Sequence, residues 1–93
     1  MDAQKIEVIG MELIENGSPL KALVDLEVGS IVIKYIRLVQ RAGQPLRISL
    51  PALKKGTPAD WRWEPAIVIT AQDLRRGIEK AILDEYRRKT GSR

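Results

Sequence analysis

The sequence predicts an α+β domain in which an antiparallel sheet of about five strands is covered on one face by a single C-terminal helix. Two observations support this fold class. Apolar residues alternate with polar ones along residues 20–28, which is the period of a half-buried strand. Residues 71–89 instead carry apolar side chains three to five positions apart, which is the spacing of one helical face.

The first three strands are expected over residues 6–14, 20–28 and 31–39. Residues 6–14 have the β-branched content of a strand, with apolar side chains at both odd and even positions. Asn16-Gly17 and Gly29-Ser30 are the residue types that tight hairpin turns prefer. We therefore expect these strands to form an antiparallel meander.

The second half of the chain adds two short strands. Residues 46–50 alternate between apolar and polar side chains and are followed by Pro51, which predicts a fourth strand that ends there. Residues 51–65 show no strand or helix period, and loops of this length in compact domains are commonly functional or mobile. The apolar run over residues 66–69 predicts a fifth strand that leads into the helix.

The helix is bounded by recognisable signals. Thr70 is a favoured N-cap residue, and Asp73 in the first turn suits the positive end of the helix dipole. Gly91, just beyond the last periodic residue, is a typical stop. The apolar face that is expected to pack on the sheet consists of Ala71, Leu74, Ile78, Ala81, Ile82 and Tyr86.

Length and composition limit the possible functions. The 93 residues suffice for one domain, spanning residues 1–93, with one modest core. The chain contains no cysteine and no histidine, which excludes disulfides, Cys/His zinc sites and Cys or His nucleophiles. It offers no nucleophile–base pair, phosphate loop or metal-ligand spacing, so we expect no enzymatic activity, no cofactor and no metal. The polar N-terminus and the lack of a ~20-residue apolar run predict a cytoplasmic protein without a membrane span.

The net charge of +4 is unevenly distributed. Residues 1–45 carry five Lys/Arg against six Asp/Glu, whereas residues 46–93 carry eleven against six. A basic half is typical of a protein with a polyanionic partner, although surplus lysine and arginine more often only solvate a surface.

The irregular segment 51–65 holds the strongest candidate binding residues. Lysines and an arginine there can contact phosphates, and the two tryptophans can stack on bases. Arg47, on the polar side of the strand that leads into the segment, is a weaker addition. The predicted nucleic-acid-binding residues are Lys54, Lys55, Arg62, Trp61, Trp63 and Arg47.

Structural alternatives apply to the same residues. Trp61 and Trp63 are two positions apart, so both could pack on the sheet, since large aromatic side chains dominate small cores. The lysines could form only a solvated loop tip. The basic residues of the helix have carboxylates three or four positions away, which favours local ion pairs over a binding role.

One helix can cover only one face of the sheet. On the expected alternation, Leu23, Ile36, Leu38 and part of the first strand remain apolar on the other face. An exposed apolar face commonly marks a protein interface. We therefore expect a homodimer in which the β-region forms the contact, unless segment 51–65 folds back over that face.

Short segments distributed over residues 6–86 also match a known pattern in order and spacing. They are Lys21-Ala22, Ile36-Arg37-Leu38-Val39, Leu50-Pro51, Pro65 and, as the most specific segment, Ile78-Glu79-Lys80-Ala81-Ile82-Leu83-Asp84-Glu85-Tyr86. On these segments the chain resembles the stage V sporulation protein G family of bacterial septation regulators. It departs from the family pattern at Ala52, at Ala59-Asp60-Trp61 and at Glu64.

The resemblance implies a small dimeric α+β protein that binds DNA, and in some members RNA, and regulates genes in processes such as septation and sporulation. It also implies that Lys54 and Lys55 contact nucleic acid. The alternative from another class is a protein–protein interaction module without nucleic-acid binding, in which Trp61 and Trp63 anchor a partner.

Overall fold

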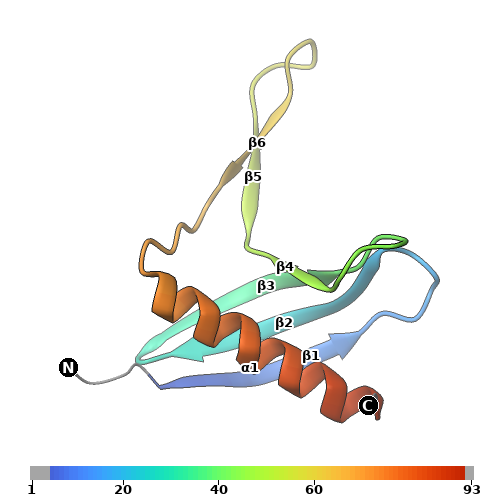
Figure 1. Ribbon diagram of the computed structural model, residues 1–93. Helices are drawn as coiled ribbons and strands as arrows, with labels where there is room; N and C mark the ends of the chain where they lie inside the picture. The colour runs from blue at the N-terminus through green and yellow to red at the C-terminus, as the bar shows by residue number, and fades with distance from the viewer. Residues whose placement is uncertain (1–4, 92–93) are drawn as a thin grey trace.

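A computed structural model describes residues 5–91 of the chain and confirms the α+β class. A four-stranded antiparallel sheet packs against one C-terminal helix, and a separate two-stranded ribbon projects from this body (Figure 1). The sheet has four strands where about five were expected. The elements are β1 Ile6–Leu13, β2 Leu20–Val28, β3 Ile31–Val39, β4 Arg47–Ser49, β5 Ala52–Lys55, β6 Arg62–Pro65 and α1 Gln72–Thr90.

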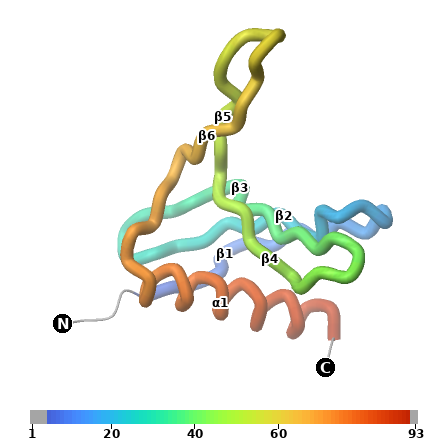
Figure 2. The backbone as a smooth tube through the Cα atoms, turned by 45° about the horizontal axis from the view of Figure 1, so that its top comes forward, coloured from blue at the N-terminus to red at the C-terminus, as the bar shows by residue number. Residues whose placement is uncertain are grey.

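The sheet is a simple meander in which β1, β2, β3 and β4 follow one another in space as they do in the chain. Every neighbouring pair is antiparallel. The expected meander of the first three strands is thereby confirmed, and β4 extends it by one strand. Because β4 pairs only with β3, its other edge lies at the border of the sheet, next to the point where the ribbon begins (Figure 2).

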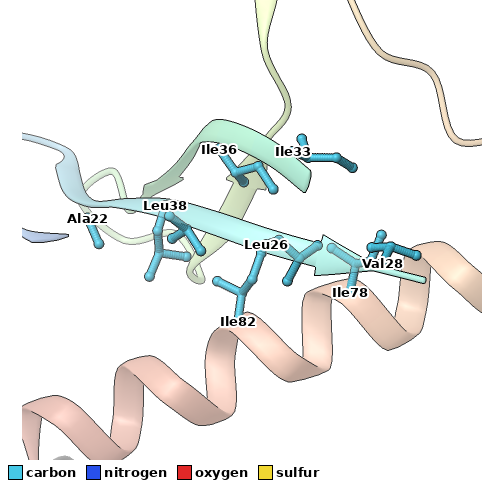
Figure 3. Close-up of a cluster of buried hydrophobic side chains, with 9 residues drawn as sticks. Ala22, Leu26, Val28, Ile33, Ile36, Leu38, Ile78 and Ile82 are labelled. Carbon is cyan, nitrogen blue, oxygen red and sulfur yellow. The ribbon is translucent and has the colours of Figure 1, made fainter. Parts of the chain in front are cut away.

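The core lies between β2, β3 and α1 (Figure 3). Alternate residues of β2 point at the helix, as its period of two predicts, and Leu26 is fully buried there. From the helix, Ile78 and Ile82 are fully buried against the sheet. Burial of a large aliphatic side chain is worth about 1.5–3 kcal/mol relative to exposure. The buried core residues are Ala22, Val24, Leu26, Val28, Ile33, Ile36, Leu38, Ile78 and Ile82.

A bulge in β1 changes the expected arrangement of residues 6–14, in which both faces of the strand carried apolar side chains. Val8 pairs with Leu26 while Gly10 pairs with Asp25, so Ile9 is one residue too many. The extra residue returns Met11 to the side of Val8, and both pack against the core. The strand therefore has one apolar face toward the helix, and Ile9 remains 49% exposed.

A second bulge, in β3, lies opposite the same aspartate. Two residues, Lys34 and Tyr35, oppose the single Asp25 of β2. Tyr35 has φ 64°, a left-handed conformation that is uncommon outside glycine. The carboxylate of Asp25 lies 3.5 Å from the Tyr35 amide that donates to it and 3.4 Å from the Lys34 ammonium. It thereby satisfies the Tyr35 N–H in the bulge and pairs with the charge of Lys34.

Because of the β3 bulge, two apolar residues that were expected on the outer face of the sheet lie on the helix side. Ile36 and Leu38 were expected to face away from the helix, but both are fully buried beside it. The two residues of the bulge, Lys34 and Tyr35, restore Ile36 to the same side as Ile33. The prediction from odd and even positions fails here because it assumes one residue opposite each residue of the neighbouring strand, whereas the bulge places two residues opposite Asp25.

The helix runs one residue later than the expected 71–89. Its N-cap is Ala71 rather than Thr70, and no side chain caps this end. At the other end Gly91 adopts the left-handed conformation, with φ 69°, and its N–H donates to the Arg87 carbonyl, as a glycine stop requires. The hydroxyl of Thr90 donates to the Tyr86 carbonyl at 2.8 Å, which extends the last turn.

The fifth strand was predicted in the wrong place. Residues 66–69 form no strand, and Ile67 and Ile69 pack singly against the core as part of the connection to α1. The expected loop 51–65 instead contains β5 and β6, which pair with each other. We call residues 52–65 the arm. A hydrogen bond of 2.9 Å from the Ala66 N–H to the Pro51 carbonyl closes its base.

The arm makes the molecule elongated. The radius of gyration is 14.4 Å, whereas a compact chain of this length has about 12 Å. The extents are 44 × 36 × 22 Å, and both views show the arm standing away from the sheet and helix (Figures 1 and 2). An isolated two-stranded hairpin is at best marginally stable in water. The arm is therefore the part of the fold that depends least on the core.

We predict that Ile82→Ala lowers the free energy of unfolding by about 2–5 kcal/mol, because it leaves a cavity under β2. Urea denaturation followed by circular dichroism measures this change. Ile31→Ala is the matched control, because the Ile31 side chain is 64% exposed. Its expected cost is below about 1 kcal/mol. Equal costs for the two variants would contradict the assignment of the core.

Candidate nucleic-acid interface

The arm brings five of the six predicted site residues together. Lys54 and Lys55 lie on β5, Arg62 and Trp63 on β6, and Trp61 immediately before β6. Cross-strand pairing sets Lys54 opposite Trp63 and Lys55 opposite Arg62. Because side chains alternate between the faces of a ribbon, these two pairs lie on opposite faces.

The aromatic face of the arm carries Lys54, Trp61 and Trp63. The ammonium of Lys54 lies 4.7 Å from the centroid of the Trp61 ring, a cation–π contact. Trp61 is 49% exposed and Trp63 is 66% exposed. The alternatives in which these tryptophans pack on the sheet or cover its open face are therefore wrong. Two large indoles instead stand in solvent beside a lysine.

The opposite face of the arm carries Lys55 and Arg62. The Nε of Arg62 lies 3.3 Å from a carboxylate oxygen of Glu64, so a local ion pair partly neutralises its charge. Lys55 has no carboxylate within ion-pair distance among residues 5–91. Exposed Leu53 also lies on this face, opposite Glu64. This face is less aromatic than the other.

A glycine determines how the chain turns at the tip of the arm. Gly56 has φ 106°, and a Cβ atom at this position would overlap the backbone carbonyl oxygen of Asp60. The turn is closed by the Asp60 N–H, which donates to the Thr57 carbonyl at 2.8 Å. Only glycine fits here without moving the backbone that sets the β5–β6 register.

Arg47 is the one predicted site residue that the fold does not place on the arm. It is the first residue of β4, in the body, and pairs with Val39 of β3. It lies beside Arg41 in a shallow depression at the β3–β4 turn. It belongs to a separate basic surface on the body and does not extend the arm's own cluster.

A hollow of about 610 Å³ lies at the base of the arm. One side is the aromatic face of the arm, represented by Trp63, and the other is the edge strand β4 and the connection to α1. Arg37 from β3 and Arg75 from the first turn of α1 reach the same hollow. Neither arginine was predicted as a site residue. The residues that line it are Arg37, Ile48, Ser49, Leu50, Ala52, Trp63, Pro65, Ile67, Val68 and Arg75.

Arg37 is held in place by a neutral partner. Its guanidinium donates to the Ser49 hydroxyl at 3.0 Å. Arg37 and Ser49 are also direct cross-strand partners of β3 and β4. No carboxylate within the described part of the chain lies within ion-pair distance of it. Its positive charge therefore remains uncompensated at the edge of the hollow.

The basic residues of the helix are largely occupied by local pairs, as their spacing predicts. Lys80 donates to Asp84 at 2.7 Å, and this hydrogen bond lowers the pKa of the Asp84 carboxyl. The guanidinium of Arg88 likewise lowers the pKa of Glu85 by hydrogen bonding. Arg75 lies 3.6 Å from Glu79. The arm is therefore a better candidate for binding polyanions than the outer face of the helix.

The open face of the sheet is partly apolar, but Ile36 and Leu38 do not contribute to it as expected. Ile36 and Leu38 are buried on the helix side, and Leu23 is half-buried. The bulges leave Ile9 and Tyr35 exposed on this face, together with Val32 near the turn end of β3. This surface is distinct from the arm and offers apolar area for contact with another protein.

Between residues 5 and 91 no helix has both the length and the apolar character needed to cross a bilayer. No family model matches the chain, and neither a search of curated proteins nor one of solved structures finds a match. The resemblance to the stage V sporulation protein G family remains a prediction from the segments quoted above.

We predict that Gly56→Ala disorders the tip of the arm, because the added methyl group collides with the Asp60 backbone. The amide resonances of β5 and β6 should shift, while those of the four-stranded sheet stay in place. Gly43→Ala is the control, since Gly43 also has a positive φ of 74° but has nothing within 4 Å of an added Cβ. Unchanged arm resonances in Gly56→Ala would contradict the described turn.

Proposed function

We propose that this protein binds nucleic acid through the arm and acts as a regulatory protein of the stage V sporulation protein G type. The observation that carries the proposal is the exposed cluster of Lys54, Trp61 and Trp63 on one face of a ribbon that stands away from the body. Lysines neutralise phosphates, and indoles offer flat surfaces on which bases stack.

The geometry of the arm favours a partner outside the chain. A ribbon that makes no core contacts gains little stability from exposing Trp63 and Leu53. Charge and aromaticity concentrated on a protruding element are therefore explained better by binding than by folding. A projecting two-stranded ribbon also has the dimensions to enter the major groove of DNA.

The cellular role follows from the resemblance and is part of the same proposal. The protein regulates genes linked to septation or sporulation-like processes, binds DNA and in addition RNA, and works in the cytoplasm. No enzymatic step or small-molecule substrate is needed for this role.

We further propose a homodimer in which the open faces of two sheets meet. The support is the exposed apolar side chains of Ile9, Val32 and Tyr35 on a face that no element of the described chain covers. The resemblance implies that a second copy of this chain covers the open face. Two copies carry two arms, which doubles the number of phosphate contacts.

We predict that changing Lys54 and Lys55 together to alanine weakens binding to oligonucleotides of every sequence and flattens the salt dependence. Losing two phosphate contacts reduces the slope of log affinity against log salt by roughly 1.8 on duplex DNA. Fluorescence polarisation at several salt concentrations measures both quantities.

The control for charge alone is a variant with Lys21 and Lys89 changed to alanine. It has the same net charge as the arm variant, and both lysines lie outside the arm. It should bind nearly as tightly as the parent protein. An arm variant that binds like the parent at every salt concentration would exclude the arm as the phosphate-binding element.

The dimer is tested by sedimentation at tens of micromolar, where the expected mass is twice the 10.5 kDa of one chain. Val32→Lys should yield the monomer, because it buries a charge in the proposed contact. Val68→Lys is the matched control, since Val68 is 70% exposed but lies in the connection to α1. A parent protein that sediments as a monomer would rule out the dimer.

Failure to bind any nucleic acid at low salt would favour the protein-interaction alternative. Exposed Trp61 and Trp63 beside arginine also have the composition of an interface hot spot. Tryptophan emission that does not respond to oligonucleotides would support that outcome.

A further inference from the structure

The hollow at the base of the arm continues the aromatic face of the ribbon. Residues 61, 63 and 65 share a face by alternation, and cross-strand pairing adds residues 52 and 54 to it. Ala52, Trp63 and Pro65 of this face line the hollow. A ligand that follows the aromatic face from the tip toward the body therefore arrives in the hollow.

The chemistry of the hollow combines a flat apolar surface with positive charge. The Trp63 indole is 66% exposed, and no cation lies over its ring within the described residues, in contrast to Trp61. Apolar side chains from β4 and from the connection to α1 form the opposite wall. Within residues 5–91 Arg37 is anchored only by the Ser49 hydroxyl, so its charge is available to a ligand. Arg75 adds a second guanidinium, which lies 3.6 Å from Glu79.

The volume decides what size of ligand fits. The hollow measures about 610 Å³, within the range of about 300–1,000 Å³ that is typical of small-ligand sites. One nucleotide fits such a space. A double helix does not place a base there, because the faces of its bases are covered by their neighbours.

We propose that this hollow is a nucleotide-binding site for single-stranded nucleic acid. One unpaired base lies against the indole of Trp63, and the adjacent phosphate contacts the guanidinium of Arg37. Lys54, on the same face farther from the body, holds the backbone of the next part of the strand. This inference rests on the proposed function and narrows it to unpaired DNA or RNA.

The first test reads the base contact directly. Trp61→Phe leaves Trp63 as the only tryptophan of the chain. In this background, oligo(dT) and oligo(U) should quench the tryptophan emission, whereas a blunt duplex of equal length should not. Trp63→Ala should weaken single-strand binding roughly tenfold or more, which corresponds to loss of one stacked base. Trp63→Phe should restore most of the affinity.

The second test separates Arg37 from general electrostatics. Arg37→Gln should lower the affinity for oligo(dT) several-fold and reduce its salt slope by roughly 0.7, which corresponds to one lost phosphate on a single strand. Arg76→Gln is the matched control. Arg76 bonds only to Gln72 within the described residues and does not line the hollow.

The outcomes distinguish this inference from the proposed function. Duplex binding that depends on Lys54 and Lys55, together with an unchanged single-strand affinity in Trp63→Ala, overturns the nucleotide site and leaves the arm as a duplex binder. Equal losses in Arg37→Gln and Arg76→Gln overturn the contact with Arg37. No binding to any of the three polymers overturns the proposed function itself.

Discussion

The fold depends on one constraint: a single helix has to cover the apolar side chains of several strands at once. β2 meets this requirement with an alternation over residues 22–28 that places Leu26 against Ile78 and Ile82. Each of its two neighbours absorbs one extra residue opposite Asp25. Asp25 thus lies where both ladders shift register, and its carboxylate accepts a hydrogen bond from the Tyr35 N–H in the β3 bulge. The apolar residues of three strands reach one layer only because of these shifts.

This constraint explains which parts of the fold could be predicted from the sequence. β2, the turns and α1 follow from local periodicity and from residues such as Gly91, whose role depends on its own backbone. The bulges could not be predicted, because counting alternate positions assumes that no residue is extra. The strand expected at residues 66–69 failed for another reason. Ile67 and Ile69 alternate like strand residues, yet they pack against the core without a hydrogen-bonded partner.

The candidate site likewise contains residues that the sequence predicted and residues that only the structure places there. Composition identified Lys54, Trp61 and Trp63, because two tryptophans beside lysines are conspicuous in a chain with four aromatic residues. The arm has no buried face, so its strands lack the alternation of apolar and polar residues from which a strand is predicted. The approach of Arg37 and Arg75 to Trp63 joins three elements that are distant in the sequence. Only the tertiary arrangement brings them to one hollow.

The attachment of the arm has an evolutionary consequence. The ribbon joins the body through a narrow base, where the Ala66 N–H meets the Pro51 carbonyl, and most of its side chains contact solvent. Substitutions in the arm, other than at Gly56, therefore carry little penalty to folding of the sheet and helix. The arm is thus free to vary among related chains while the body stays fixed, as an antibody loop varies on its framework.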